Sequence, residues 1–191
     1  MYAVAVNGSA RKGGNTEILL NEVLSELKKA GWETDLLPVG GTGIRGCIAC
    51  GVCLEKKDME CAIKNDVFNE VFAKMTKADA IVLGSPTYFA GVAADMKALL
   101  ERSGYVARAN GNAFTGKIGA AVVALRRGGA INAFDTINHM YQMSRMIIPG
   151  STYWNMGFGR EIGEVNSDEE GLRTMSTLGK HMAWLLKKIH A

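Results

Sequence analysis

The chain has 191 residues, of which 48% are hydrophobic and 21% are charged, and its formal net charge at pH 7 is +3. This length and composition predict one α/β domain with a full hydrophobic core. The Lys and Arg residues are scattered, so we expect no nucleic-acid partner. The first residues lack the pattern of a signal peptide, and no apolar run has the roughly 18 residues of a membrane span, so we expect a cytoplasmic protein with no membrane partner.

Apolar runs of strand length alternate along the chain with segments whose apolar residues recur at helical spacing. The expected strands are residues 2–6, 33–39, 80–83, 118–125 and, near Pro149, 146–151. The expected helices are residues 16–30, 66–77, 91–103, 130–146 and 168–189. Such alternation is typical of a parallel sheet covered by helices on both faces. Because no repeat or linker interrupts the pattern, we expect a single domain over residues 1–191.

The loop after the first predicted strand has the composition of an anion site. It is rich in glycine and runs directly into a helix, whose positive end and backbone N–H groups attract an anion. Ser9, Asn15 and Thr16 add short hydrogen-bond donors, and Arg11 adds charge. This set suits a terminal phosphate dianion, and there is no Walker A motif for a nucleoside triphosphate. The alternative is a plain turn with Asn15 or Thr16 as the helix cap.

The loop after the third predicted strand combines a fixed turn with aromatic side chains. Ligands of open parallel sheets bind beyond the carboxyl ends of the strands, so this loop belongs beside the first one. Pro86 fixes the turn, and Thr87, Tyr88 and Phe89 supply backbone amides and two rings. This combination suits a flat, redox-active ring system. The alternative is that both aromatic rings merely cap the core.

The loop after the fourth predicted strand is basic and glycine-rich. Arg127, Gly128 and Gly129 can supply backbone N–H donors and positive charge near a ring that becomes anionic on reduction. An ordinary glycine turn with solvated arginines would have the same composition. The function of this loop therefore depends on its neighbours.

All four cysteines lie in one short segment with the spacing C-x2-C-x2-C-x7-C, at Cys47, Cys50, Cys53 and Cys61. A compact array of four thiolates can hold a metal centre, most plausibly an iron–sulfur cluster. Zn²⁺ also accepts four thiolates, but its usual pattern is two separated pairs. Reactive thiols and buried small apolar residues are further alternatives. We place the array in a cysteine-rich insertion loop at residues 40–65.

Several motifs in the same order resemble the NADPH-dependent FMN reductase family, in its iron–sulfur flavoprotein branch. The shared pieces are the cysteine segment, Gly8-Ser9-x-Arg11-x2-Gly14-Asn15-Thr16, Gly84-Ser85-Pro86-Thr87-Tyr88-Phe89, Tyr153-Trp154-Asn155 and Glu164-Val165-x2-Asp168-Glu169-Glu170-Gly171. The resemblance implies a flavodoxin-like, doubly wound, five-stranded parallel sheet. It implies that the first loop binds the FMN phosphate and that residues 86–89 and 127–129 contact the isoalloxazine. It also implies that the four cysteines ligate a [4Fe–4S] cluster.

By resemblance, the protein is an FMN-dependent oxidoreductase that passes electrons from NAD(P)H or a ferredoxin-like donor to a flavin, quinone or other small acceptor. Because flavin performs the hydride chemistry, we expect no catalytic side chain. One alternative is an electron carrier that relays electrons between the cluster and FMN, with protein partners as donor and acceptor. Another is a flavin-binding regulatory or storage protein. The family also implies a homodimer or homotetramer, for which Tyr105, Tyr141 and Trp154 are candidate interface aromatics.

Overall fold

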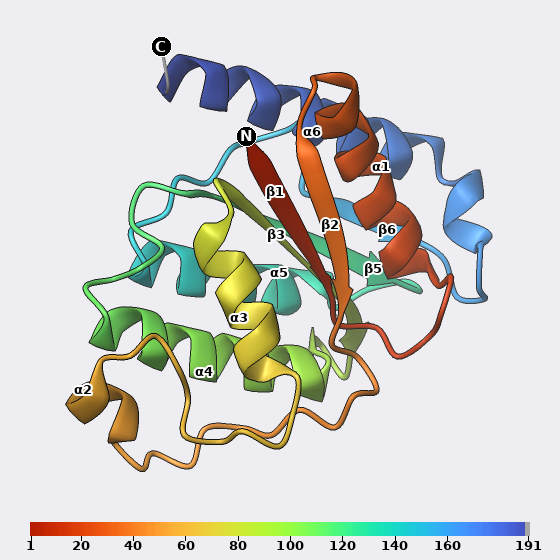
Figure 1. Ribbon diagram of the computed structural model, residues 1–191. Coiled ribbons are helices and arrows are strands. Elements are labelled where there is room, and N and C mark those ends of the chain that lie inside the picture. Colours follow the sequence, from red (N-terminus) through yellow and green to blue (C-terminus); the bar gives the residue numbers. More distant parts are fainter. Residues whose placement is uncertain (190–191) are drawn as a thin grey trace.

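The computed structural model describes residues 1–189, so the last two residues of the predicted domain, His190 and Ala191, lie outside the described residues. Within residues 1–189, five parallel strands form one sheet in the order β2-β1-β3-β5-β6 (Figure 1). Their bounds are β1 Tyr2–Asn7, β2 Glu33–Pro38, β3 Ala80–Tyr88, β5 Ile118–Leu125 and β6 Met156–Phe158. This is the flavodoxin-like, doubly wound strand order, so the predicted fold class is confirmed.

Helices cover both faces of this sheet (Figure 1). One layer consists of α1 (Asn15–Lys29) and α6 (Glu169–Ile189). The other consists of α3 (Phe68–Lys77), α4 (Ala94–Ala109) and α5 (Ala130–Met143). Side chains alternate between the two layers along each strand. On β1, for example, Ala3 and Ala5 pack toward α1 and α6, whereas Val4 and Val6 pack toward the other layer.

The fifth parallel strand lies later in the chain than the sequence predicts. The prediction of a strand at residues 146–151 is wrong, since this stretch makes only an isolated bridge between Ile147 and Ile118. Pro149 has no N–H to donate and interrupts the ladder. The pairing with β5 resumes at Asn155, whose carbonyl accepts a hydrogen bond from the Val123 N–H at 2.9 Å.

The region between β3 and α4 also differs from the prediction. β3 does not stop at Leu83 but continues through Pro86 to Tyr88. The partner strand β1 ends opposite Gly84, so one edge of β3 is open where the proline lies. A two-residue strand, β4 (Gly91–Val92), then pairs antiparallel with Thr87 and Tyr88 and delays the start of α4 to Ala94.

Two short elements were not predicted from the sequence. The cysteine segment contains α2 (Val52–Lys56), and a 3₁₀ helix, η1 (Glu164–Ser167), precedes α6.

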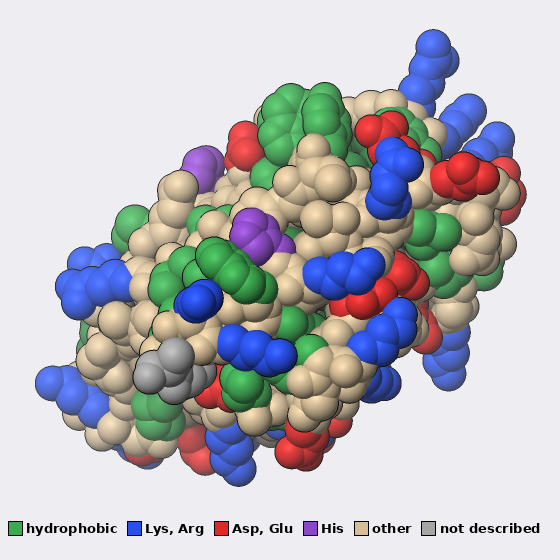
Figure 2. Space-filling view, turned by 90° about the horizontal axis from the view of Figure 1, so that it is seen from above, with side chains coloured by type: hydrophobic (Ala, Val, Ile, Leu, Met, Phe, Trp, Pro, Cys, Tyr) green, Lys and Arg blue, Asp and Glu red, His purple; other side chains and the backbone are tan. Residues whose placement is uncertain are grey.

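None of the helices within residues 1–189 is long and apolar enough to cross a membrane. On the face where the strands begin, Figure 2 shows Lys and Arg side chains interspersed with Asp and Glu.

Tyr141 on α5 lies in the core, so its prediction as an exposed interface residue is wrong. Its ring is completely buried. The hydroxyl donates to the Ala120 carbonyl at 3.0 Å and accepts the Leu83 N–H at 3.1 Å. Burial raises the pKa of this phenol well above its ordinary value. Tyr141 therefore joins α5 to β3 and β5. Tyr105 and Trp154, by contrast, are about half exposed.

Candidate functional sites

The loops after β1, β3 and β5 meet at the carboxyl edge of the sheet and line a cleft of about 270 Å³. Seven of the predicted cofactor residues lie together there. They are Ser9, Arg11, Asn15, Thr16, Pro86, Thr87 and Tyr88. Residues 124–126 of the β5 end and Gly159, Arg160 and Ile162 complete the lining. The cleft therefore lies where ligands of this sheet architecture bind.

The amino terminus of α1 opens into this cleft without a side-chain cap. The residue before the helix is Gly14, which has no side chain to accept the first N–H groups. The backbone N–H groups of Asn15 and Thr16 have no partner among residues 1–189. The Thr16 side chain is almost fully buried and lines the cleft. Unpartnered donors at a helix start form a ready anion site.

Ser9 shapes the turn that leads to this helix. Its N–H donates to Asn7 Oδ1 at 2.9 Å, and its Oγ accepts the Arg11 N–H at 3.2 Å. Both bonds are local side-chain-to-backbone contacts of the kind that stabilise tight turns. The turn therefore holds its shape through the protein's own contacts.

Asn15 has a role that the sequence did not reveal. Its Nδ2 donates to the Glu161 carbonyl at 2.9 Å, and its Oδ1 accepts the Gly163 N–H at 3.0 Å. The side chain is thus tied to the loop that follows β6. Arg11 makes a similar tie, with Nη1 donating to the Arg160 carbonyl at 2.8 Å. These contacts fix the third wall of the cleft, which is the loop that follows β6.

The β3–β4 hairpin forms the opposite wall. The Thr87 Oγ1 is buried and has no hydrogen-bond partner within the described residues. Phe89 and Ala90 at the tip have positive φ values of 46° and 61°. Phe89 is fully exposed and does not line the cleft, whereas Tyr88 is half exposed and does. Backbone strain of this kind is more frequent at functional sites than elsewhere.

The loop after β5 reaches the cleft through a different residue from those predicted. Arg126 lines it, whereas Arg127 does not. Gly128 and Gly129 line an adjacent cleft of about 290 Å³. Gly129 approaches the hairpin so closely that a Cβ there would lie 3.2 Å from the Cβ of Ala90. The β5 loop thus supports the hairpin tip.

The four cysteines line a single cavity of about 250 Å³, beside α4. Cys50 is exposed and the other three are half-buried. Burial raises the pKa of the Cys53 thiol, and the three neighbouring cysteines raise it further. Within residues 1–189, no group of three or more His, Cys, Asp or Glu side chains converges closely enough to hold a metal ion. The four cysteines therefore line a shared cavity, and their side chains do not meet at a point.

Three comparisons identify the chain. The model of the NADPH-dependent FMN reductase family matches residues 1–161. An iron–sulfur flavoprotein of Methanocaldococcus jannaschii is 35% identical, with 99% of each chain covered. An iron–sulfur flavoprotein of Archaeoglobus fulgidus is 33% identical, with 97% of each chain covered.

The fold comparison agrees. The WrbA-like flavodoxin structure from Agrobacterium tumefaciens superposes with a TM-score of 0.69 at 16% identity, over 98% of each chain. The chain therefore belongs to the NADPH-dependent FMN reductase family, a family of FMN flavoproteins.

Proposed function

We propose that the cleft at the carboxyl edge binds FMN and that the protein is an FMN-dependent oxidoreductase. In this proposal NAD(P)H or a ferredoxin-like protein donates electrons, and a flavin, quinone or other small molecule accepts them. The observation that carries the proposal is the uncapped amino terminus of α1 inside the cleft. When bound, FMN supplies the hydride and single-electron chemistry, and the protein contributes binding, orientation and electrostatics.

The cleft residues divide into two groups by their chemistry. The Thr16 hydroxyl and the N–H groups of Asn15 and Thr16 are the donors for the phosphate. The buried, unpartnered Thr87 Oγ1 is a donor for the polar edge of the ring, beside Tyr88. Arg126 adds positive charge near a ring that gains negative charge on reduction. Donors at both ends of one cleft fit a molecule that is anionic at one end and aromatic at the other.

The phosphate assignment predicts a large effect of Thr16→Val, which removes the hydroxyl and keeps the shape of the side chain. A hydrogen bond to a charged group contributes about 1.5–3 kcal/mol, so we expect FMN to bind roughly ten- to a hundredfold more weakly. Titration of apoprotein with FMN, followed by flavin fluorescence, measures this. Thr76→Val is the control, because the exposed Thr76 hydroxyl bonds only to the Ala73 carbonyl of its own helix. Equal affinity of the Thr16→Val variant and the wild type would contradict the assignment.

We also propose that Cys47, Cys50, Cys53 and Cys61 ligate an iron–sulfur cluster of the [4Fe–4S] type. All four cysteines line one cavity, and the curated relatives are named iron–sulfur flavoproteins. Thiolates are the ligands such clusters require. Zn²⁺ also accepts four thiolates, but its usual pattern is two separated Cys pairs, and the continuous triplet of Cys47, Cys50 and Cys53 departs from it.

The cluster proposal predicts iron, sulfide and a broad absorption shoulder beneath the flavin bands after anaerobic purification. Cys50→Ala should lose the shoulder and most of the iron, since one of four ligands is gone. Ile48→Ala is the control, because this side chain is exposed in the same loop and is no ligand. Zinc without iron in the anaerobic wild-type protein would refute the proposal.

The cysteine cavity specifically favours a second candidate, an electron carrier that relays electrons between the cluster and FMN for protein partners. A carrier needs no small substrate. Steady oxidation of NAD(P)H with a simple quinone or flavin acceptor would exclude it. Reduction by a ferredoxin-like protein, without turnover of any small acceptor, would instead exclude the reductase.

We infer a homodimer or homotetramer in solution. The cleft beside the proposed FMN site is lined by three aromatic side chains that are at least half exposed, Tyr153, Trp154 and Phe158. Aromatic residues of this kind are enriched at protein interfaces. A monomer in sedimentation velocity would contradict the inference.

A further inference from the structure

A buried ion pair lies at the base of the cysteine segment. Arg102, in the middle of α4, donates through Nη1 to Asp66 Oδ2. The two side chains are 0% and 3% exposed. Burying both charges is costly, and hydrophobic residues of similar size are often at least as stable in such places. The pair therefore suggests a role beyond packing.

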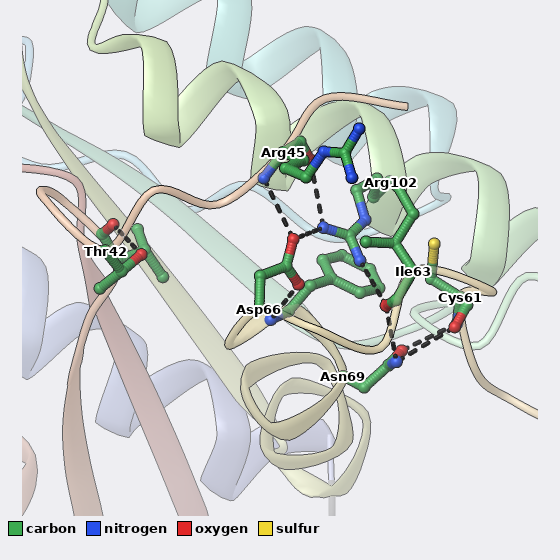
Figure 3. A network of polar contacts seen from close by, with 9 residues as sticks. Thr42, Arg45, Cys61, Ile63, Asp66, Asn69 and Arg102 are labelled. Atoms are coloured by element: carbon green, nitrogen blue, oxygen red, sulfur yellow. Dashed lines mark hydrogen bonds and ion pairs between the residues drawn. The ribbon is translucent and has the colours of Figure 1, made fainter. Parts of the chain in front are cut away.

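The Arg102 guanidinium bonds to both ends of the cysteine segment. Nη1 donates to the Arg45 carbonyl at 3.1 Å, two residues before Cys47. Nη2 donates to the Ile63 carbonyl at 3.1 Å, two residues after Cys61. One planar group thus holds together the entry and the exit of the loop that carries all four thiols (Figure 3).

Three neighbouring side chains strengthen the closure. Asp66 Oδ2 also accepts the Arg45 N–H at 3.1 Å. The Asn69 side chain bonds to both backbone groups of Cys61. Its Oδ1 accepts the Cys61 N–H at 2.8 Å, and its Nδ2 donates to the Cys61 carbonyl at 3.1 Å (Figure 3). The Phe68 ring lies under the guanidinium, 4.1 Å from its central carbon. The geometry of Arg102 is therefore fixed from several sides.

Arg102 also lines the cysteine cavity and retains one donor atom that makes no hydrogen bond. Its Nε is buried without a hydrogen-bond partner among residues 1–189. Buried donors are nearly always satisfied, so an orphaned one needs an explanation. A cluster held by four thiolates is negatively charged, and nearby charge and hydrogen bonds set its reduction potential. The Arg102 charge therefore lies at the wall of the cavity in which an anionic cluster would sit.

We propose that Arg102 is the positioning residue of the four-cysteine centre. It closes the base of the loop so that Cys61 shares a cavity with the other three cysteines, and it places a buried positive charge beside that cavity. The second role rests on the proposed cluster, whereas the first concerns the metal-free chain. The two roles are tested separately.

The closure is tested on metal-free protein by the rate at which a thiol reagent modifies each cysteine, read by mass spectrometry. The double variant Arg102→Met with Asp66→Leu replaces the ion pair by apolar side chains, so the core retains a packing partner for Phe68. We expect Cys53 and Cys61 to react at least tenfold faster than in the wild type. Arg108→Met removes the same charge from an exposed position of the same helix and should change nothing. Unchanged protection in a folded double variant overturns the closure.

The charge is tested on anaerobically reconstituted protein by the reduction potential of the cluster. Arg102→Gln should make reduction less favourable and Asp66→Asn should make it more favourable. Each substitution should change the one-electron equilibrium constant for reduction at least tenfold. This corresponds to a shift of about 59 mV in the reduction potential. A loosened structure would shift the reduction potentials of both variants in the same direction. Shifts of opposite sign therefore separate an effect of charge from an effect of packing. Shifts of the same sign, or none, overturn the charge role. A wild type that takes up no iron refutes the proposed cluster, and the thiol measurement still decides the closure.

Discussion

Gly40→Ala is expected to destabilise the protein by about 3 kcal/mol or more and to abolish FMN binding. A Cβ at this position would lie 2.2 Å from the Ser9 carbonyl carbon and 2.6 Å from the Ala10 nitrogen. These are backbone atoms of the loop proposed to bind phosphate, and no rotamer change relieves the clash. The Gly40 N–H also donates to the Asn7 carbonyl at 3.1 Å, which holds the two segments together. The loop must therefore shift.

Urea unfolding and FMN titration measure the two effects of Gly40→Ala separately. Gly150→Ala is the matched control, because a Cβ there meets no atom within 4 Å. We expect its free energy of unfolding to change by no more than about 0.5 kcal/mol. A Gly40→Ala variant with wild-type stability and wild-type FMN affinity would show that the first loop does not pass this close to Gly40.

Asp66→Ala is expected to lower the free energy of unfolding by about 3–5 kcal/mol at pH 7, because it leaves the buried Arg102 charge without a partner. The control is Lys74→Ala, which breaks the pair between Lys74 and Asp35. Both of these side chains are about 40% exposed, so the loss should not exceed about 1 kcal/mol. Chemical denaturation of the three proteins measures the difference. Equal losses in the two variants would contradict a buried pair.

The same carboxylate predicts how this difference depends on pH. Burial alone would raise the pKa of Asp66, but hydrogen bonds from Arg102 and from the N–H groups of Arg45 and Phe68 outweigh it and hold the pKa below the ordinary value of 3.8. A lowered pKa in the folded state stabilises the protein above the pKa of the unfolded chain. This contribution is lost as the pH falls through the folded-state pKa. The stability gap between wild type and Asp66→Ala should therefore be constant from pH 7 to about pH 5 and shrink below pH 4.

The parallel sheet could be predicted because three of its strands, β1, β3 and β5, contain continuous apolar runs with buried side chains. The β5 strand, for example, is buried at every position. The fifth strand could not be located, because β6 has only three residues and Phe158 at its end is half exposed. The apolar stretch before Pro149 gives a stronger signal in the sequence. Local hydrophobicity therefore pointed to the wrong segment.

The candidate site was predictable where its residues are close in sequence. The turn from Ser9 to Thr16 is one contiguous motif, and so is the cysteine segment. The third wall of the cleft was not predicted, since the contact between Arg11 and Arg160 spans 149 positions. The buried role of Arg102 could not be predicted either, because a single arginine in a predicted helix is ordinarily interpreted as a solvated charge. Its partner Asp66 lies 36 positions away.

Helix α4 connects the two candidate sites. The residue before it, Ala93, donates its N–H to Ser85 Oγ at 2.9 Å, beside the hairpin that walls the cleft. Arg102, at the cysteine cavity, lies eight residues after the first residue of the helix, a rise of about 12 Å. An electron that passes within one chain between the cleft and the cavity would therefore cross a distance that the length of helix α4 fixes. Its transfer rate should respond to driving force and be insensitive to solvent viscosity.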